Sequence, residues 1–115
     1  MELDQLVALT REALDDMKAT DIHVIDIRGK SSMTDFIILA CGTSTRHVKS
    51  LANNIKVRVK EAGIEPLGSE GETEGEWVLV DLNDVIVHVM LPDVRDFYKL
   101  EKIWEPTPAA EKTQA

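Results

Sequence analysis

The stretch that decides the fold is DFIILACGTSTRHVKSLANNIKVRVKEAG, residues 35–63. Residues 35–41 are apolar at almost every position, which is typical of a central strand covered on both faces. Small residues follow at 42–45, and residues 46–62 then carry apolar side chains at steps of three and four, which predicts an amphipathic helix. The segment therefore predicts a strand, a short turn and a helix in direct succession.

The turn within this segment has two interpretations. Thr43 or Ser44 would cap the start of the helix, and Gly63 would end it. Alternatively, the backbone N–H groups of 42–44 would bind a phosphate at the helix N-terminus. The chain has neither of the glycine-rich phosphate-binding motifs, so capping is favoured.

Segments on both sides extend this unit into an α/β domain. Residues 3–18 carry an apolar stripe that predicts a helix, and the β-branched run 21–27 predicts a strand. Two more strands, 77–82 and 84–91, require a tight hairpin in which Asn83 suits a positive φ.

The C-terminal third completes the organisation. Residues 66–76 are rich in Gly and Glu without periodicity and are expected to form a mobile acidic loop. A short helix is expected from Asp93 through Trp104, whereas 105–115 contains two prolines and is expected to be a disordered tail. The chain is thus predicted to be one α/β domain, 1–104, with a small mixed β-sheet, packed helices and the order α-β-β-α-β-β-α.

Composition restricts the classes of function. The chain has 115 residues, 43% hydrophobic and 30% charged, as expected of a soluble globular protein, and no signal or membrane-spanning segment is apparent, which predicts a cytoplasmic protein. The net charge of −8 disfavours non-specific nucleic-acid binding and favours a basic partner. Residues 45–62 are an exception, because five basic residues stand there against one acidic residue.

An enzymatic site is poorly supported by the pattern of carboxylates and histidines. Metal-dependent nucleotidyl transfer needs carboxylates that converge on the ions, and no two aspartates stand two positions apart. His23, His47 and His88 are each without a His or Cys at metal-ligand spacing, so we expect no metal site. His88 is instead expected to be hydrogen-bonded at the sheet edge or under a helix, and Cys41 to be inert packing.

Trp77 stands at the start of a strand, where Trp77, Leu79 and Asp81 would project from the side opposite Val78 and Val80. A tryptophan on a half-exposed sheet would contribute strongly to a partner-binding patch. The alternative, that the C-terminal helix covers it, stays open at this point.

Three stretches resemble the ribosomal silencing factor family, also called Iojap-related proteins: TDFIILACGTSTRHV (34–48), EGETEGEWVLVDLNDVIVHVM (70–90) and RDFYKLEKIW (95–104). The resemblance implies a nucleotidyltransferase-like core that lacks the catalytic carboxylates, and hence a protein that is not an enzyme and needs no cofactor. It further implies a translation repressor, active when nutrients are scarce, that binds the large ribosomal subunit through its protein number fourteen and sterically blocks joining of the small subunit.

The resemblance and the charge pattern together suggest a partner-binding patch on the hairpin and the last helix. Its carboxylates would attract a basic surface and its apolar side chains would supply the binding energy. The alternatives are a large-subunit assembly factor and a metal-dependent nucleotidyltransferase; a homodimer of the free protein and an rRNA contact of the basic helix 46–60 also stay open. The predicted patch residues are Glu70, Trp77, Asp81, Leu82, Met90 and Tyr98.

Overall fold

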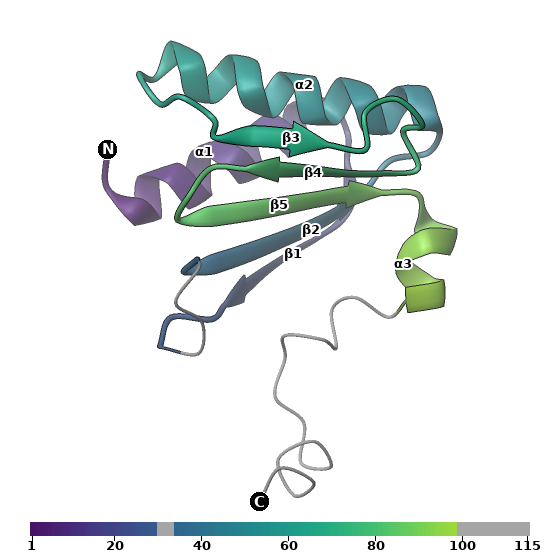
Figure 1. The fold of residues 1–115 in the computed structure, drawn as a ribbon, viewed down its shortest axis with the longest axis horizontal. Coiled ribbons are helices and arrows are strands. Elements are labelled where there is room, and N and C mark those ends of the chain that lie inside the picture. The colour runs from purple at the N-terminus through teal and green to yellow at the C-terminus, as the bar shows by residue number, and fades with distance from the viewer. Residues whose placement is uncertain (30–33, 99–115) are drawn as a thin grey trace, which may run out of the picture.

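The computed structural model describes residues 1–29 and 34–98 (Figure 1). Its centre is one mixed sheet in which the strands follow the order β1-β2-β5-β4-β3. The central neighbours β2 and β5 pair in parallel, and all other pairs in the sheet are antiparallel. The strands are β1 (Thr20–Asp26), β2 (Phe36–Cys41), β3 (Gly68–Glu70), β4 (Trp77–Asp81) and β5 (Val85–Met90).

The three helices do not share one face of the sheet. Helices α1 (Leu3–Asp16) and α2 (Thr45–Glu61) lie together on one side, and α3 (Pro92–Tyr98) follows β5 and packs on the other through Val94 (Figure 1). None of the described helices is long and apolar enough to cross a lipid bilayer. The predicted α/β class and element order are confirmed, with β3 as an additional short strand.

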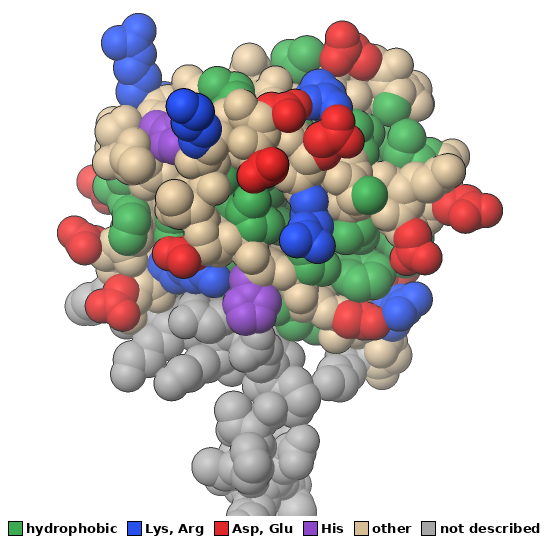
Figure 2. All heavy atoms as spheres, turned by 180° about the vertical axis from the view of Figure 1, so that it is seen from behind, with side chains coloured by type: hydrophobic (Ala, Val, Ile, Leu, Met, Phe, Trp, Pro, Cys, Tyr) green, Lys and Arg blue, Asp and Glu red, His purple; other side chains and the backbone are tan. Residues whose placement is uncertain are grey.

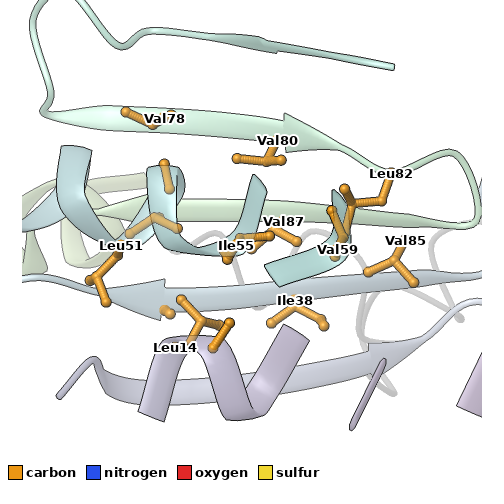
Figure 3. Packing of buried hydrophobic residues seen from close by; sticks show 14 of the residues in the cluster. Leu14, Ile38, Leu51, Ile55, Val59, Val78, Val80, Leu82, Val85 and Val87 are labelled. Carbon is orange, nitrogen blue, oxygen red and sulfur yellow. The ribbon is translucent and has the colours of Figure 1, made fainter. Parts of the chain in front are cut away.

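The two faces of the sheet bury two separate apolar clusters. The strand β2 is buried at every position, as its sequence predicts, because its side chains alternate between the two clusters. The larger cluster joins α1 and α2 to the sheet; Ile55 of α2 lies beside Val87 of β5 (Figure 3). The smaller cluster, on the other face, contains Ile25, Ile27, Ile37, Leu39, Cys41 and Met90.

Helix α2 is bounded by the residues that the sequence indicates. The Ser44 hydroxyl accepts a hydrogen bond of 3.1 Å from the backbone N–H of His47 and so caps the helix start. At the other end Gly63 adopts φ +88°, and Ile64 N–H donates to the Val59 carbonyl at 2.8 Å. This is the left-handed termination that glycine favours.

The prediction of a loop without regular structure at 66–76 is wrong for residues 68–70. Its residues Gly68–Glu70 form β3, which pairs with β4. In the turn that follows, the Glu72 carboxylate accepts hydrogen bonds from Lys56 and Ser69, and the bond from Lys56 chiefly holds the pKa of Glu72 below its usual value. Local composition did not reveal these partners because Lys56 lies on α2, far away in the sequence.

The predicted C-terminal helix is described only in part. Its described portion, α3, starts at Pro92 rather than Asp93. The continuation toward Trp104 and the tail predicted at 105–115 lie outside the described residues.

The first prediction concerns the larger cluster. We expect Ile55→Ala to lower the free energy of unfolding by about 2–5 kcal/mol, because Ile55 is completely buried and its truncation leaves a cavity between α2 and the sheet. Val57→Ala on the same helix is the matched control, since Val57 is 45% exposed, and it should change stability by no more than about 0.5 kcal/mol. Urea unfolding of both variants measures this; equal losses would contradict the assigned packing of α2.

Candidate partner-binding surface

The face of the sheet opposite α1 and α2 is buried unevenly. Along β2, Ile37 and Leu39 on this face are at most 2% exposed. On the same face, the side chains of β3 and β4 and Ile86 of β5 remain half-buried or exposed, whereas His88 and Met90 of β5 are buried. We call these residues the outer patch: Glu70, Trp77, Leu79, Asp81 and Ile86.

A hydrogen bond between Trp77 and His88 orders the centre of the outer patch. The indole Nε1–H donates to Nδ1 of His88 at 2.9 Å, and the two ring centroids lie 5.8 Å apart at an interplanar angle of 51°. Because Nδ1 accepts, it carries no proton in this arrangement. Burial lowers the pKa of His88 from its usual value near 6.5 to about 4, so the imidazole is neutral at pH 7. The prediction of a hydrogen-bonded histidine is confirmed, and its partner is the tryptophan of the patch. The predicted place at the sheet edge is wrong, because β5 is the central strand of the sheet.

A glycine brings Glu70 beside this pair. Gly71 has φ +88°, and a Cβ at this position would lie 2.1 Å from the backbone oxygen of Trp77, so only glycine fits where the turn after β3 crosses β4. The preceding residue, Glu70, pairs with Leu79 in the β3–β4 register. The result is an open pocket of about 270 Å³ lined by Glu70, Gly71, Trp77, Leu79 and His88.

Two of the predicted anchors are not exposed. Leu82 is 3% exposed and points toward Val59 and Val85 in the larger cluster (Figure 3). Side chains alternate along a strand, so Leu82 follows Val80 onto the helix-covered face. Met90 lies on the face of Trp77, but it is completely buried in the smaller cluster. Both were wrong as exposed anchors.

Leu79 and Ile86 take their places in the outer patch, and the sequence contained the signal for both. Leu79 stands two positions after Trp77 and Ile86 two positions before His88, so each shares a strand face with that residue. In the sheet Trp77 pairs with Met90, and Leu79 pairs with His88. Alternation indicated the correct face, but only the packed structure distinguishes the half-buried Ile86 from the buried Met90.

The hairpin end of the patch is ordered by Asp81. Its Oδ1 accepts a hydrogen bond of 2.8 Å from the backbone N–H of Asn83, which has φ +75° as predicted. Asp81 is half-buried and pairs with Ile86, so it belongs to the outer patch. The backbone of Tyr98 ends α3, and its side chain lies outside what the structure describes.

The turn before α2 uses its polar groups within the protein. The N–H of Thr43 donates to Nδ1 of His47 at 2.8 Å, and Nε2 of His47 donates to the carbonyl of Met17 at 2.7 Å. His47 thus joins the start of α2 to the end of α1. Together with the Ser44 cap, this contact favours the capping interpretation over phosphate binding.

The basic charge of α2 is partly compensated by neighbouring elements. Arg58 contacts Glu12, 3.0 Å away, and Asp16 of α1, while Lys56 contacts Glu72. The view from behind shows acidic and basic side chains interspersed rather than one basic patch (Figure 2). This distribution favours the solvated interpretation of the basic helix.

Cys41 is 1% exposed, and its Sγ accepts a hydrogen bond of 3.7 Å from Nη1 of Arg95 in α3. The expected packing role is consistent with this burial. Within residues 1–29 and 34–98, no three His, Cys, Asp or Glu side chains are grouped so that they could hold a metal ion.

Comparison with known proteins gives consistent matches over nearly the whole chain. A family model described as "Ribosomal silencing factor during starvation" matches residues 1–115. Ribosomal silencing factor RsfS of Chromobacterium violaceum is 50% identical over 104 residues, covering 90% of this chain and 85% of that protein. A crystal structure of a Chromobacterium violaceum protein has a TM-score of 0.89 at 48% identity and covers 93% of this chain and 92% of that one.

A more distant relative carries a different description. The mouse protein named mitochondrial assembly of ribosomal large subunit protein 1 is 33% identical over 106 residues. The match covers 90% of this chain but 45% of the mouse protein.

The second prediction concerns the pH dependence of stability. Because the pKa of His88 is about 4 in the folded chain and near 6.5 in the unfolded chain, the unfolded chain binds the proton first as the pH falls. The stabilisation linked to neutral His88 is therefore present above pH 6.5 and is lost as the pH falls to about 4. His88→Gln keeps an acceptor for Trp77 and does not titrate. Between pH 6.5 and 4 the wild type should lose on the order of 3 kcal/mol more than this variant, measured by urea unfolding at each pH. Parallel stability curves would refute the assignment.

Proposed function

The chain belongs to the ribosomal silencing factor family, and we propose that it represses translation in the cytoplasm by binding the large ribosomal subunit through that subunit's protein number fourteen. Bound there, it obstructs the surface on which the small subunit docks. The mechanism is steric exclusion and requires stable contact but no bond-making chemistry.

The outer patch is the observation that supports docking. It combines an indole with the aliphatic side chains of Leu79 and Ile86, and the carboxylates of Glu70 and Asp81 lie among them. Protein interfaces draw most of their binding energy from a few aromatic and apolar residues within a polar rim. The hydrogen bond to His88 reduces the rotational freedom of Trp77 before binding, so less entropy is lost when the partner arrives.

Charge supports a protein partner over a bare nucleic acid. The chain carries a net charge of −8, and the outer patch itself contains the carboxylates of Glu70 and Asp81. Such a surface attracts basic protein and is repelled by phosphate.

An assembly role is the second candidate, and one observation favours it. The mouse relative is named for assembly of the ribosomal large subunit. A domain that binds the large subunit would serve either role, depending on whether it meets precursor or mature particles. Co-sedimentation with precursor particles, but not with mature subunits, would favour assembly over silencing.

The third prediction tests steric exclusion directly. Excess protein added to purified large and small subunits should reduce the fraction that sediments as joined ribosomes, because the bound domain occupies the docking surface. Sucrose-gradient sedimentation with and without the protein measures this fraction. An unchanged fraction, with the protein bound to large subunits in the same gradient, would exclude the proposed mechanism.

The fourth prediction concerns the indole. Trp77→Ala should weaken binding to large subunits by about 2 kcal/mol or more, or roughly thirtyfold in Kd, as interface tryptophans often do. Val57→Ala, on the helix-covered side, serves as the control and should bind normally. Unfolding curves for both variants must be measured as well, so that lost affinity is separated from lost stability. Normal affinity of a folded Trp77→Ala protein would remove the tryptophan from the interface.

A further inference from the structure

The pocket beside Trp77 has a chemical character that narrows what can enter it. Its walls are one carboxylate (Glu70), one indole (Trp77), the aliphatic side chain of Leu79, a histidine, and the bare backbone of Gly71. The carboxylate is on an exposed residue, whereas His88 is 6% exposed. The histidine is neutral, so Glu70 gives the pocket its negative charge.

A cation is the complementary occupant. Carboxylates pair with cations, and the face of a tryptophan ring attracts a cation more strongly than that of any other side chain. Neither group favours an anion. A phosphate from rRNA would be repelled by the carboxylate of Glu70.

The size and shape of the pocket favour one side chain of a larger partner. Sites for small molecules typically enclose about 300–1,000 Å³ and bury most of the ligand. This pocket measures about 270 Å³ and is open to solvent. A metabolite would remain largely exposed there, whereas a side chain delivered by a docked protein would have its other atoms covered by the rest of that interface.

Between the two basic side chains, guanidinium fits better than ammonium. Its planar group stacks on an aromatic ring and donates two parallel hydrogen bonds to one carboxylate. It is also less strongly hydrated, so transfer into a partly apolar pocket costs less. Leu79 and Trp77 supply apolar surface for the aliphatic part of the arginine side chain.

We propose that the pocket formed by Glu70, Gly71, Trp77, Leu79 and His88 receives one arginine side chain of the ribosomal protein partner. Glu70 neutralises the guanidinium, and Trp77 contacts its plane. The assignment deepens the proposed function and rests on it, because it names the group through which the partner is recognised.

Charge reversal at Glu70 tests the proposal, with a matched control in the same segment. Glu70→Lys places a cation in the pocket, whereas Glu74→Lys makes the same change at an exposed position outside its lining. Glu72 is unsuitable as a control because it pairs with Lys56. Affinity for purified large subunits is measured for the wild type and both variants at two salt concentrations.

The proposal predicts that Glu70→Lys weakens binding at least about tenfold more than Glu74→Lys. Equal losses would mean that only long-range attraction is involved and would overturn the pocket assignment. Tighter binding of Glu70→Lys would indicate a phosphate neighbour and would also overturn it. If the wild type itself fails to bind large subunits, the proposed function fails and this inference falls with it. If the wild type binds but Glu70→Lys and Glu74→Lys lose affinity equally, only the pocket assignment fails.

A charge-swap rescue identifies the group from the partner. Surface arginines and lysines of the partner protein are changed singly to glutamate, and each variant is tested for binding to the Glu70→Lys chain. One arginine variant should restore most of the lost affinity while weakening binding to the wild type. Rescue by a lysine variant alone, or by none, would overturn the arginine assignment.

Discussion

The burial of β2 on both faces is the constraint on which the rest of the structure depends. A strand that is apolar at every position cannot lie on a surface, so the sheet must be covered on both sides there. Helices α1 and α2 supply the cover on one side, and α3 lies on the other. The crossover through α2 returns the chain to the end of the sheet where β2 begins, and the antiparallel strands β3, β4 and β5 that follow leave β5 parallel to β2.

The cover on the second face is uneven, and that unevenness leaves the outer patch partly exposed. Toward β1 and β2 the apolar side chains are buried, whereas toward β4 they are half-exposed. The half-exposed side chains are held in place, because Trp77 donates to a histidine that burial keeps neutral and Gly71 crosses its backbone closely. The outer patch is therefore an ordered apolar surface bordered by carboxylates, which is the property that the proposed docking requires.

The short turn before α2 uses its polar groups for contacts within the protein. Its position, after a central strand and before a helix, would suit a phosphate. Yet one of its backbone N–H groups donates to His47, and the same ring reaches across to α1. The turn therefore joins two helices, and this internal use of its polar groups agrees with a family described by silencing of the ribosome.

The sequence by itself determined the strand-turn-helix unit, the hairpin with Asn83 at positive φ, a helix cap at Thr43 or Ser44, and the family, because these follow from local periodicity, turn chemistry and contiguous motifs. The structure then identified Ser44 as the capping residue. The alternation of side chains along the strand was also sufficient to assign Leu82, two positions after Val80, to the helix-covered face. Only the tertiary structure decided that the glutamate-rich segment contains a strand, that Met90 is buried while Ile86 is not, and that Glu70 meets Trp77. These outcomes depend on residues distant in sequence, such as Lys56, which bonds to Glu72, and α3, which packs on the cluster that contains Met90. Alternation along a strand predicts the face on which a side chain lies, but it does not predict how deeply neighbouring elements bury that side chain.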